Sequence, residues 1–158
     1  ADQVPVISMS IAEEEISAIG LDNVKGQLTA WNYYQTLDSS ENQKFVKNFK
    51  AKYGASKPTS DPMESAYTSL YLWKAMVEKA KSFDVDKVKA AADGVTFNAP
   101  EGKVTVDGEN HHIYKTSYIG RIEDDLLIHT VWQSDGPIAP DPYLKTYSWA
   151  KSLNASAQ

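Results

Sequence analysis

The chain has 158 residues, 42% of them hydrophobic, and a net charge of −5 at pH 7, which is ordinary for one soluble globular domain with a sizeable core. It contains no cysteine, which excludes disulfides, thiolate metal ligands and cysteine nucleophiles. No basic cluster stands out and no apolar run approaches the roughly 20 residues of a membrane span, so neither nucleic-acid binding nor a transmembrane segment is expected.

The first part of the chain, up to residue 54, is predicted to alternate between strands and helices. Residues 4–10 form a short apolar run that predicts a buried strand, and residues 11–19 predict a helix capped by Ser10 and ended by Gly20. Residues 24–34 predict a second strand because they are rich in β-favouring side chains. An amphipathic helix is then expected to begin after Ser39 or Ser40 and to end at Gly54.

The longest predicted helix has Asp61 as its N-cap, Pro62 at its first position and Glu64 at its third. Its apolar face is broad, which indicates a helix that packs on more than one side. Asp84 is expected to cap a further helix over residues 85–92.

Strands dominate after residue 94. They are predicted over 104–106, 113–122 and 126–132, the last two paired as a hairpin. The whole order is typical of an α/β fold with a β-rich C-terminal part, in which helices cover a parallel sheet. The parallel strands are too few for a complete doubly wound domain, so the pattern predicts a partial one.

Glu13, Glu14 and Glu15 lie in the first turn of a predicted helix, where the helix dipole favours negative charge. A solvated first turn is the common meaning of such a run. The alternative is a ligand-binding carboxylate, which would accept N–H donors through charge-assisted hydrogen bonds.

Metal and catalytic sites are not indicated. His111 and His112 are adjacent, and adjacent side chains on a strand point to opposite faces, so a hydrogen-bonded pair in a turn is favoured over a metal site. The known nucleophile and phosphate-binding motifs are absent, so no enzyme and no cofactor are expected. A Ser–His–acid set assembled from distant residues stays open, and with it an amide hydrolase.

Five short segments together resemble a known family across residues 4–143. They are Ser10-Ile-Ala-Glu-Glu-Glu, Ala30-Trp-Asn-Tyr-Tyr, Glu64-Ser-Ala-Tyr67, Asn98-Ala-Pro-Glu-Gly102 and Pro140-Asp-Pro-Tyr143. In order and spacing they resemble the C-terminal part of type I periplasmic solute-binding proteins, and within them the urea and short-chain amide branch.

The resemblance implies a partial type I periplasmic binding fold, with Rossmann-like parallel sheet layers flanked by helices. Such proteins are more than twice as long as this chain, so it also implies a fragment whose N-terminal half is missing. The implied division assigns residues 1–31 and 117–135 to lobe 2 and residues 36–112 to lobe 1. The chain would cross the hinge at 32–35 and 113–116, and residues 136–158 would form a C-terminal extension.

The resemblance also implies which residues bind a ligand. The loop after the first strand would face the cleft between the lobes, which brings in Ser10, Glu13 and Glu14. Two further places would line or flank that cleft: the aromatic side chains at the first hinge crossing, and the start of the long helix. The candidates there are Trp31, Tyr33 and Glu64, for which core packing and helix capping are the alternative roles.

The function implied is an extracytoplasmic or periplasmic binding protein that captures urea or a short amide and delivers it to the membrane permease of an ABC importer. Further expected partners are the missing N-terminal half and, for the isolated fragment, a second copy of itself. A cytoplasmic amide-sensing regulator and a branched-chain amino acid binding protein remain as alternatives.

Overall fold

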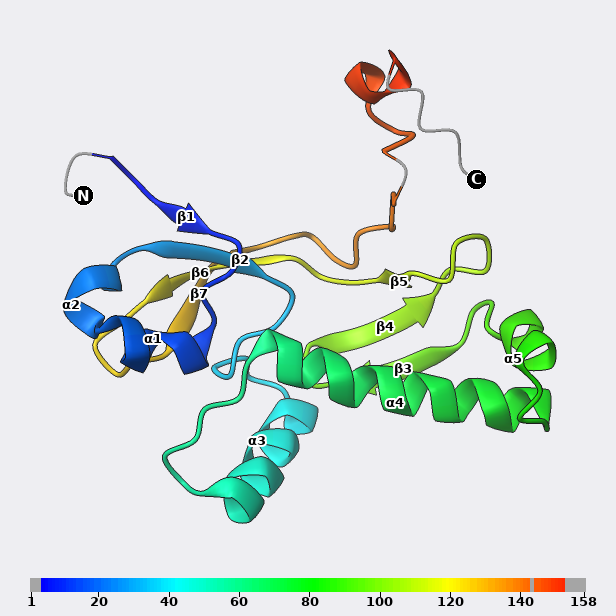
Figure 1. Ribbon diagram of the computed structural model, residues 1–158, viewed down its shortest axis with the longest axis horizontal. Helices are drawn as coiled ribbons and strands as arrows, with labels where there is room; N and C mark the ends of the chain where they lie inside the picture. Colours follow the sequence, from blue (N-terminus) through cyan, green and yellow to red (C-terminus); the bar gives the residue numbers. More distant parts are fainter. Residues whose placement is uncertain (1–3, 143, 153–158) are drawn as a thin grey trace.

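Two β-sheets, each with its own helices, make up the computed structural model, which describes residues 4–142 and 144–152 (Figure 1). We call them unit A and unit B. The predicted α/β fold class is confirmed, although the parallel part is confined to one pair of strands. None of the described helices is long and apolar enough to cross a membrane.

Unit A holds a four-stranded sheet in the order β1-β2-β6-β7. Its members are β1 (Ile7–Ser8), β2 (Leu28–Trp31), β6 (Tyr118–Ile122) and β7 (Ile128–Gln133), with the helices α1 (Glu13–Ile19) and α2 (Leu21–Val24). β1 pairs with β2 in parallel, whereas β2–β6 and β6–β7 are antiparallel. The predicted C-terminal hairpin is therefore confirmed as β6–β7.

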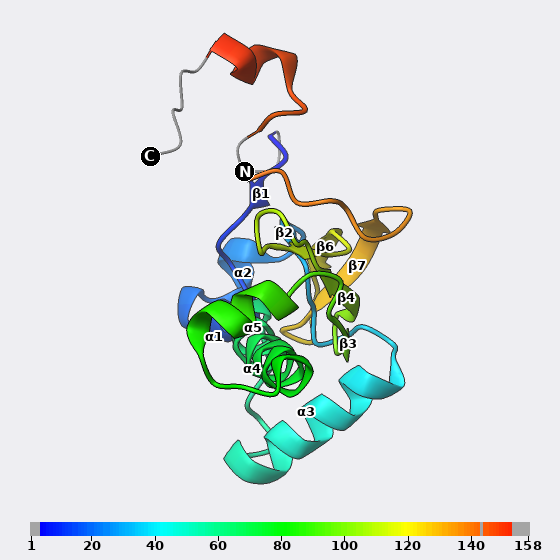
Figure 2. The ribbon, with the colours of Figure 1, turned by 90° about the vertical axis from the view of Figure 1, so that its right-hand side faces the viewer.

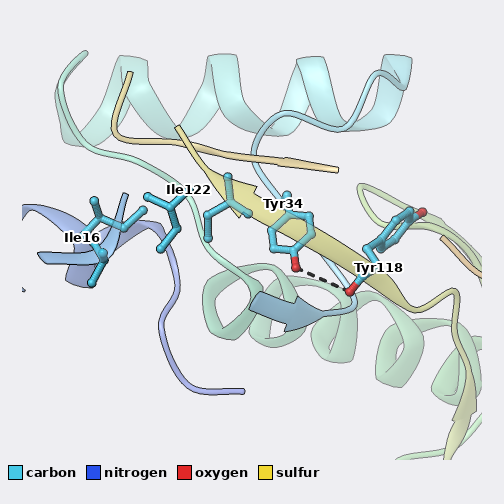
Figure 3. Packing of buried hydrophobic residues seen from close by; sticks show 6 residues of the cluster. Ile16, Tyr34, Tyr118 and Ile122 are labelled. Atoms are coloured by element: carbon cyan, nitrogen blue, oxygen red, sulfur yellow. Dashed lines mark hydrogen bonds between the residues drawn. The ribbon is translucent and has the colours of Figure 1, made fainter. Parts of the chain in front are cut away.

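The core of unit A lies between α1, α2 and the sheet (Figure 3). It is built from the buried side chains Ile16, Val24, Tyr34, Tyr118, Ile122 and Ile128. Tyr34 reaches this core from beyond the end of β2, and its hydroxyl donates to the Thr29 carbonyl at 2.8 Å. Each fully buried aliphatic side chain contributes about 1.5–3 kcal/mol to folding relative to an exposed one.

Unit B holds a three-stranded antiparallel sheet and three α-helices. Its members are α3 (Ser40–Tyr53), α4 (Asp61–Ala80), α5 (Val85–Ala91), β3 (Thr96–Ala99), β4 (Gly102–Val106) and β5 (Ile113–Tyr114). α4 and α5 pack on this sheet through Leu72, Ala92, Val95, Ala99, Val104 and Val106. Figure 2 looks along α4 and shows α3 below it.

Several helix ends follow the predicted chemistry. The Ser39 hydroxyl caps α3 by accepting from Asn42 N at 3.1 Å, and Asp84 caps α5 by accepting from Lys87 N at 3.1 Å. α1 ends at Gly20, whose φ of 91° is a conformation that glycine adopts readily.

Two predicted N-caps are wrong. Ser10 does not cap α1, because the chain turns once more around the Ser8 hydroxyl and the helix begins only at Glu13, after Ala12. α4 is preceded by Ser60, one residue earlier than predicted, and Asp61 is the first residue of that helix. The Asp61 carboxylate is thereby free to bond elsewhere.

Two strand predictions also need correction. The run 4–10 is not a buried strand, because β1 lies at the edge of the sheet and leaves Val4 and Met9 68% and 75% exposed. The stretch 113–122 is two strands rather than one, because the chain passes from the sheet of unit B to that of unit A at residues 115–117.

A C-terminal segment leaves the sheets after β7. It pairs once with unit B, where Ile138 N donates to the Lys115 carbonyl at 2.7 Å, and it ends in a 3-10 helix, η1 (Ser148–Ser152). Figure 1 shows this segment pointing away from both sheets. The rest of the predicted extension, residues 143 and 153–158, lies outside the described residues.

Apolar surface is concentrated on the outer side of α4 and α5. Leu70, Trp73, Phe83 and Val85 are between 47% and 79% exposed, and a groove of about 640 Å³ runs beside them. The rest of α4 is covered by α5, by β3, where Tyr71 stacks on Phe97, and by α3, where Tyr67 meets Phe45, so the prediction that this helix packs on more than one side is confirmed. Contiguous apolar surface of this kind is typical of an interface.

We expect the isolated chain to self-associate through this surface, because association removes the exposed apolar side chains from water. Sedimentation velocity over a concentration series should show a rising weight-average mass, and Phe83→Lys together with Trp73→Lys should lower it. Thr130→Lys, on an exposed strand position, serves as the control. A monomer at all concentrations would contradict this expectation.

Candidate functional site

The chain passes between the two units at three places that lie close together. It leaves unit A after Trp31, returns through residues 115–117, and passes unit B again at residues 134–138. The second and third passages are bonded to each other, since Ser134 N donates to the Ser117 carbonyl at 2.9 Å and Ser117 N to the Ser134 hydroxyl at 3.1 Å. The Asn32 side chain joins the first passage to the second by donating to the Thr116 carbonyl at 2.8 Å.

Carboxylates from both units bond to the first passage. Asn32 N donates to Asp61 Oδ2 at 3.0 Å, so a residue next to β2 of unit A is bonded to α4 of unit B. Gln35 N donates to Glu13 Oε1 at 2.8 Å, so a residue next to α3 of unit B is bonded to α1 of unit A. The two bonds therefore cross.

The two tyrosines between these bonds point into different units. Tyr33 is fully buried, and its hydroxyl donates to Asn42 Oδ1 at 2.8 Å and lies 2.7 Å from the Thr59 hydroxyl, both in unit B. Tyr34 is fully buried in the core of unit A, where its hydroxyl, which donates mainly to the Thr29 carbonyl, also lies 3.5 Å from the Tyr118 carbonyl (Figure 3). Alternation of side chains along an extended segment explains this division.

Four buried carboxyl groups gather around the passages; we call Glu13, Asp61, Glu64 and Glu101 the carboxyl cluster. Each is at most 8% exposed. Glu64 Oε1 accepts from the Thr68 hydroxyl at 2.6 Å, and Glu101 forms an ion pair with Lys115 Nζ at 3.0 Å. The second oxygens of Glu13, Glu64 and Glu101 are buried without a hydrogen-bond partner.

Burial controls the charge of this cluster. Burial raises the pKa of Glu13 to about 8. The hydrogen bond from Gln35 N favours the ionised carboxylate and opposes this rise, but it is the smaller effect. Burial also raises the pKa of Glu64 and of Glu101, and the charge of Glu64 raises that of Glu101 further, while the Lys115 ammonium opposes both shifts. The cluster therefore carries bound protons at neutral pH.

The structure brings three of the six predicted site residues together. Glu13, Tyr33 and Glu64 are all buried; burial raises the pKa of Tyr33, and the neighbouring charges of Glu13 and Glu64 raise it further. The other three, Ser10, Glu14 and Trp31, lie at the N-terminal side of α1. Ser10 is exposed there, and Glu14 and Trp31 are half-buried.

The hydrogen bonds of Ser10 and Trp31 stay within unit A. The Trp31 indole donates to the Ile11 carbonyl at 2.8 Å, which ties the end of β2 to the loop before α1. Ser10 N donates to the Ser8 hydroxyl at 3.2 Å. Glu14 keeps one buried carboxylate oxygen without a partner.

Sequence reasoning missed Asn32, Asp61, Glu101 and Lys115 as members of this region. Asp61 was assigned to a helix cap, and Glu101 was part of a segment used for the resemblance but not of the candidate site. A charged residue within the short Asn98–Gly102 turn was the available signal, but its partner Lys115 is brought near only by the second passage.

A metal centre finds no support in the part of the chain that is described. No group of three or more His, Asp or Glu side chains there could hold a metal ion. His111 and His112 are exposed and border the groove beside α4. The carboxyl cluster is rich in acceptors, and a region of this kind suits N–H donors rather than anions.

Comparison with known proteins decides the family. The model of the periplasmic binding protein domain matches residues 1–149. The chain belongs to the periplasmic binding protein family. Its two-sheet arrangement matches the type I periplasmic binding fold, of which these residues form a part.

Solved structures similar to this family member are solute-binding proteins. One, from Rhodopseudomonas palustris HaA2 in complex with p-hydroxybenzoic acid, is 27% identical with a TM-score of 0.77, over 92% of this chain and 40% of that one. An amino acid ABC transporter substrate-binding protein from Pseudomonas fluorescens Pf-5 shares the fold, with 22% identity and a TM-score of 0.75, over 89% and 39%.

Curated relatives are also longer than this chain. Leu/Ile/Val-binding protein homolog 6 of Brucella abortus is 31% identical over 70% of this chain and 28% of its own length. A Geobacillus stearothermophilus protein named limonene hydroxylase is 29% identical over 80% of this chain and 23% of its own length. The chain thus spans about a quarter of these relatives, one of which carries the name of an enzyme.

The raised pKa of Glu13 predicts a pH dependence of stability. The folded state keeps a proton that the unfolded chain loses above its ordinary pKa of 4.5, so the contribution of this proton is complete below that pH and is lost as the pH rises through about 8. Wild type should therefore lose stability relative to Glu13→Gln between about pH 5 and about pH 9. Guanidinium chloride unfolding of both proteins across this range measures the difference.

Glu78→Gln, at an exposed position of α4, is the matched control and should show no such trend. A constant stability difference between wild type and Glu13→Gln over the whole range would contradict the assigned proton.

The Lys115–Glu101 pair gives a second prediction. Glu101 is 3% exposed and its pKa is raised to about 8, so Lys115→Met leaves a buried charge without a partner once the carboxyl ionises, and should lower the free energy of unfolding by up to about 3 kcal/mol above pH 8. Glu101→Gln in the same chain should recover a large part of this loss. Additive effects of the two substitutions in a double-mutant cycle would show that the pair is not coupled.

Proposed function

We propose that this chain is part of an extracytoplasmic solute-binding protein whose two lobes close around a small molecule. Residues 1–31 and 117–135 would belong to lobe 2, residues 36–112 to lobe 1, and the passages at 32–35 and 113–116 to the hinge. The presence of two separate sheets joined by adjacent passages supports this division. Ligand binding shifts such an equilibrium only through different affinities for the open and closed forms.

The ligand class is inferred from charge. Around the passages lie the carboxyl groups of Glu13, Glu14, Asp61, Glu64 and Glu101, and the Lys115 ammonium acts on two of them, Glu64 and Glu101. N–H donors would find acceptors among the carboxyl oxygens that have no hydrogen-bond partner, whereas the Lys115 ammonium, which could attract an anion, is already paired with Glu101. This excess of carboxyl groups is the observation that favours urea or a short amide over a benzoate, and it leaves the amino group of a branched-chain amino acid as the second candidate.

Within this proposal the six candidate residues take two roles. Ser10, Glu14 and Trp31, which are not fully buried, would face the ligand. Glu13, Tyr33 and Glu64 would support them from the buried side, since their hydrogen bonds fix the first passage and the start of α4. Any ligand contact of the second group requires a rearrangement that uncovers it.

The expected partners follow from the same proposal. The closed form would deliver its ligand to the membrane permease of an ABC importer. The apolar surface of α4 and α5 would be covered by the remainder of the binding domain, because the relatives are longer than this chain. No catalytic step is proposed; turnover of amides incubated with the protein would instead favour the hydrolase alternative.

Calorimetric titration tests the ligand class. The longer protein in which this chain lies should bind urea or acetamide, and 4-hydroxybenzoate should not compete. Glu14→Gln should weaken binding by about 1.5–3 kcal/mol, roughly ten- to a hundredfold, because a charge-assisted bond is lost. Glu78→Gln is the distant control.

Binding of leucine but not of amides would move the assignment to the amino acid branch. Tight binding of 4-hydroxybenzoate would contradict the charge argument. Unchanged affinity in Glu14→Gln would remove that residue from the site.

A further inference from the structure

The crossed hydrogen bonds at the first passage have a geometry that resists motion between the units. We define the crossed latch as the two bonds from Asn32 N to Asp61 Oδ2 and from Gln35 N to Glu13 Oε1, at 3.0 and 2.8 Å. Only Tyr33 and Tyr34 lie between the two donors. Both acceptors are buried, so water does not readily replace either bond.

Each donor of the latch moves with the unit opposite to its acceptor. Asn32 continues β2, and its side chain is bonded to Thr116 next to β6, so it moves with unit A while Asp61 moves with α4 of unit B. Gln35 is anchored to unit B, because its carbonyl accepts from Asn42 Nδ2 at 2.9 Å and its side-chain oxygen accepts from Thr59 N at 2.9 Å. Its acceptor, Glu13, moves with α1 of unit A.

A relative rotation of the units therefore stretches both bonds at once. A hinge made of unbonded backbone would offer no such resistance. We propose that Glu13 and Asp61 are positioning residues that hold units A and B in the relative orientation of this structure, through their bonds to the first passage. The biological meaning of this inference rests on the proposed two-lobed function. Its test does not, because the test measures only the relative orientation of units A and B.

The consequence for binding is an intrinsic bias. In a protein with two arrangements of its lobes, a latch that stabilises one of them sets the fraction of molecules competent for the ligand, and the apparent affinity scales with that fraction. Variants of the latch would change affinity without a contact to the ligand.

Pulsed electron paramagnetic resonance measures the orientation directly. The chain has no cysteine, so Asp22→Cys on α2 and Asn48→Cys on α3, both exposed, place one spin label on each unit. Doubly labelled chain is diluted into an excess of unlabelled chain, so that only distances within one molecule are recorded. The width of the distance distribution reports the range of orientations.

The expected result separates the latch from general stability. Glu13→Ala and Asp61→Ala should each broaden the distribution, whereas Glu13→Gln and Asp61→Asn keep an acceptor oxygen and should retain the wild-type width. Val88→Ala, in the core of unit B and away from the latch, is the control for mere destabilisation. If one alanine variant does not fold, the other still tests the latch, because its substitution lies in the other unit.

Hydrogen exchange gives a second readout. The amides of Gln35 in Glu13→Ala and of Asn32 in Asp61→Ala should exchange at least tenfold faster, with core amides of both units unchanged. Wild-type widths in both alanine variants, or equal broadening in Val88→Ala, would overturn the proposal. Both measurements are made without a ligand. If the longer protein failed to bind a solute, that failure would count against the proposed function and would not affect the test of the latch.

Discussion

The antiparallel ladder between β2 and β6 is the interaction on which the rest of the structure depends. Its register pairs Leu28 with Arg121 and Trp31 with Tyr118, so residues on either side of the whole of unit B are brought into contact. Closing so long a loop costs conformational entropy, which grows slowly with loop length and is offset here by the core around Ile122 and Tyr118. Unit B is thus an insertion into unit A, and the passages must lie together.

Close passages explain why buried charge collects at this point. Backbone amides that belong to no strand need acceptors, and Glu13 and Asp61 supply them from both sides. Carboxyl groups brought together in this way cannot all ionise in a buried setting, so protons and Lys115 compensate them. The same arrangement supplies acceptors for N–H donors, and it joins the proposed ligand specificity to the passages between the two units.

Local rules predicted the parts of this fold that depend on local chemistry. The caps of α3 and α5 and the glycine at the end of α1 follow from side chains within a few residues of each helix end. The exposure of β1 could not be predicted, because its apolar residues resemble those of a buried strand and only its place at the sheet edge decides the outcome. The division of 113–122 into two strands also depends on a contact distant in sequence, the pairing of β6 with β2.

The candidate site divides in the same way. Glu13 was a candidate because it belongs to a run of acidic residues at a helix start, whereas the resemblance to solute-binding proteins added Trp31, Tyr33 and Glu64. Asn32 and Lys115 carry no local signal, since an asparagine after a strand and a lysine between two strands are common. Their importance arises only when three distant passages meet.

The insertion of unit B has a consequence for synthesis of the chain. Residues emerge from the ribosome in order, so β1, α1 and β2 appear first and their partner β6 only after all of unit B has followed. At the usual elongation rates of about 5–20 residues per second, β2 waits several seconds with one edge unpaired. Unit B can fold in that interval, because its sheet and helices are contiguous in sequence. A nascent chain from which unit B has emerged, but β6 has not, should therefore contain a folded unit B beside an open and aggregation-prone unit A.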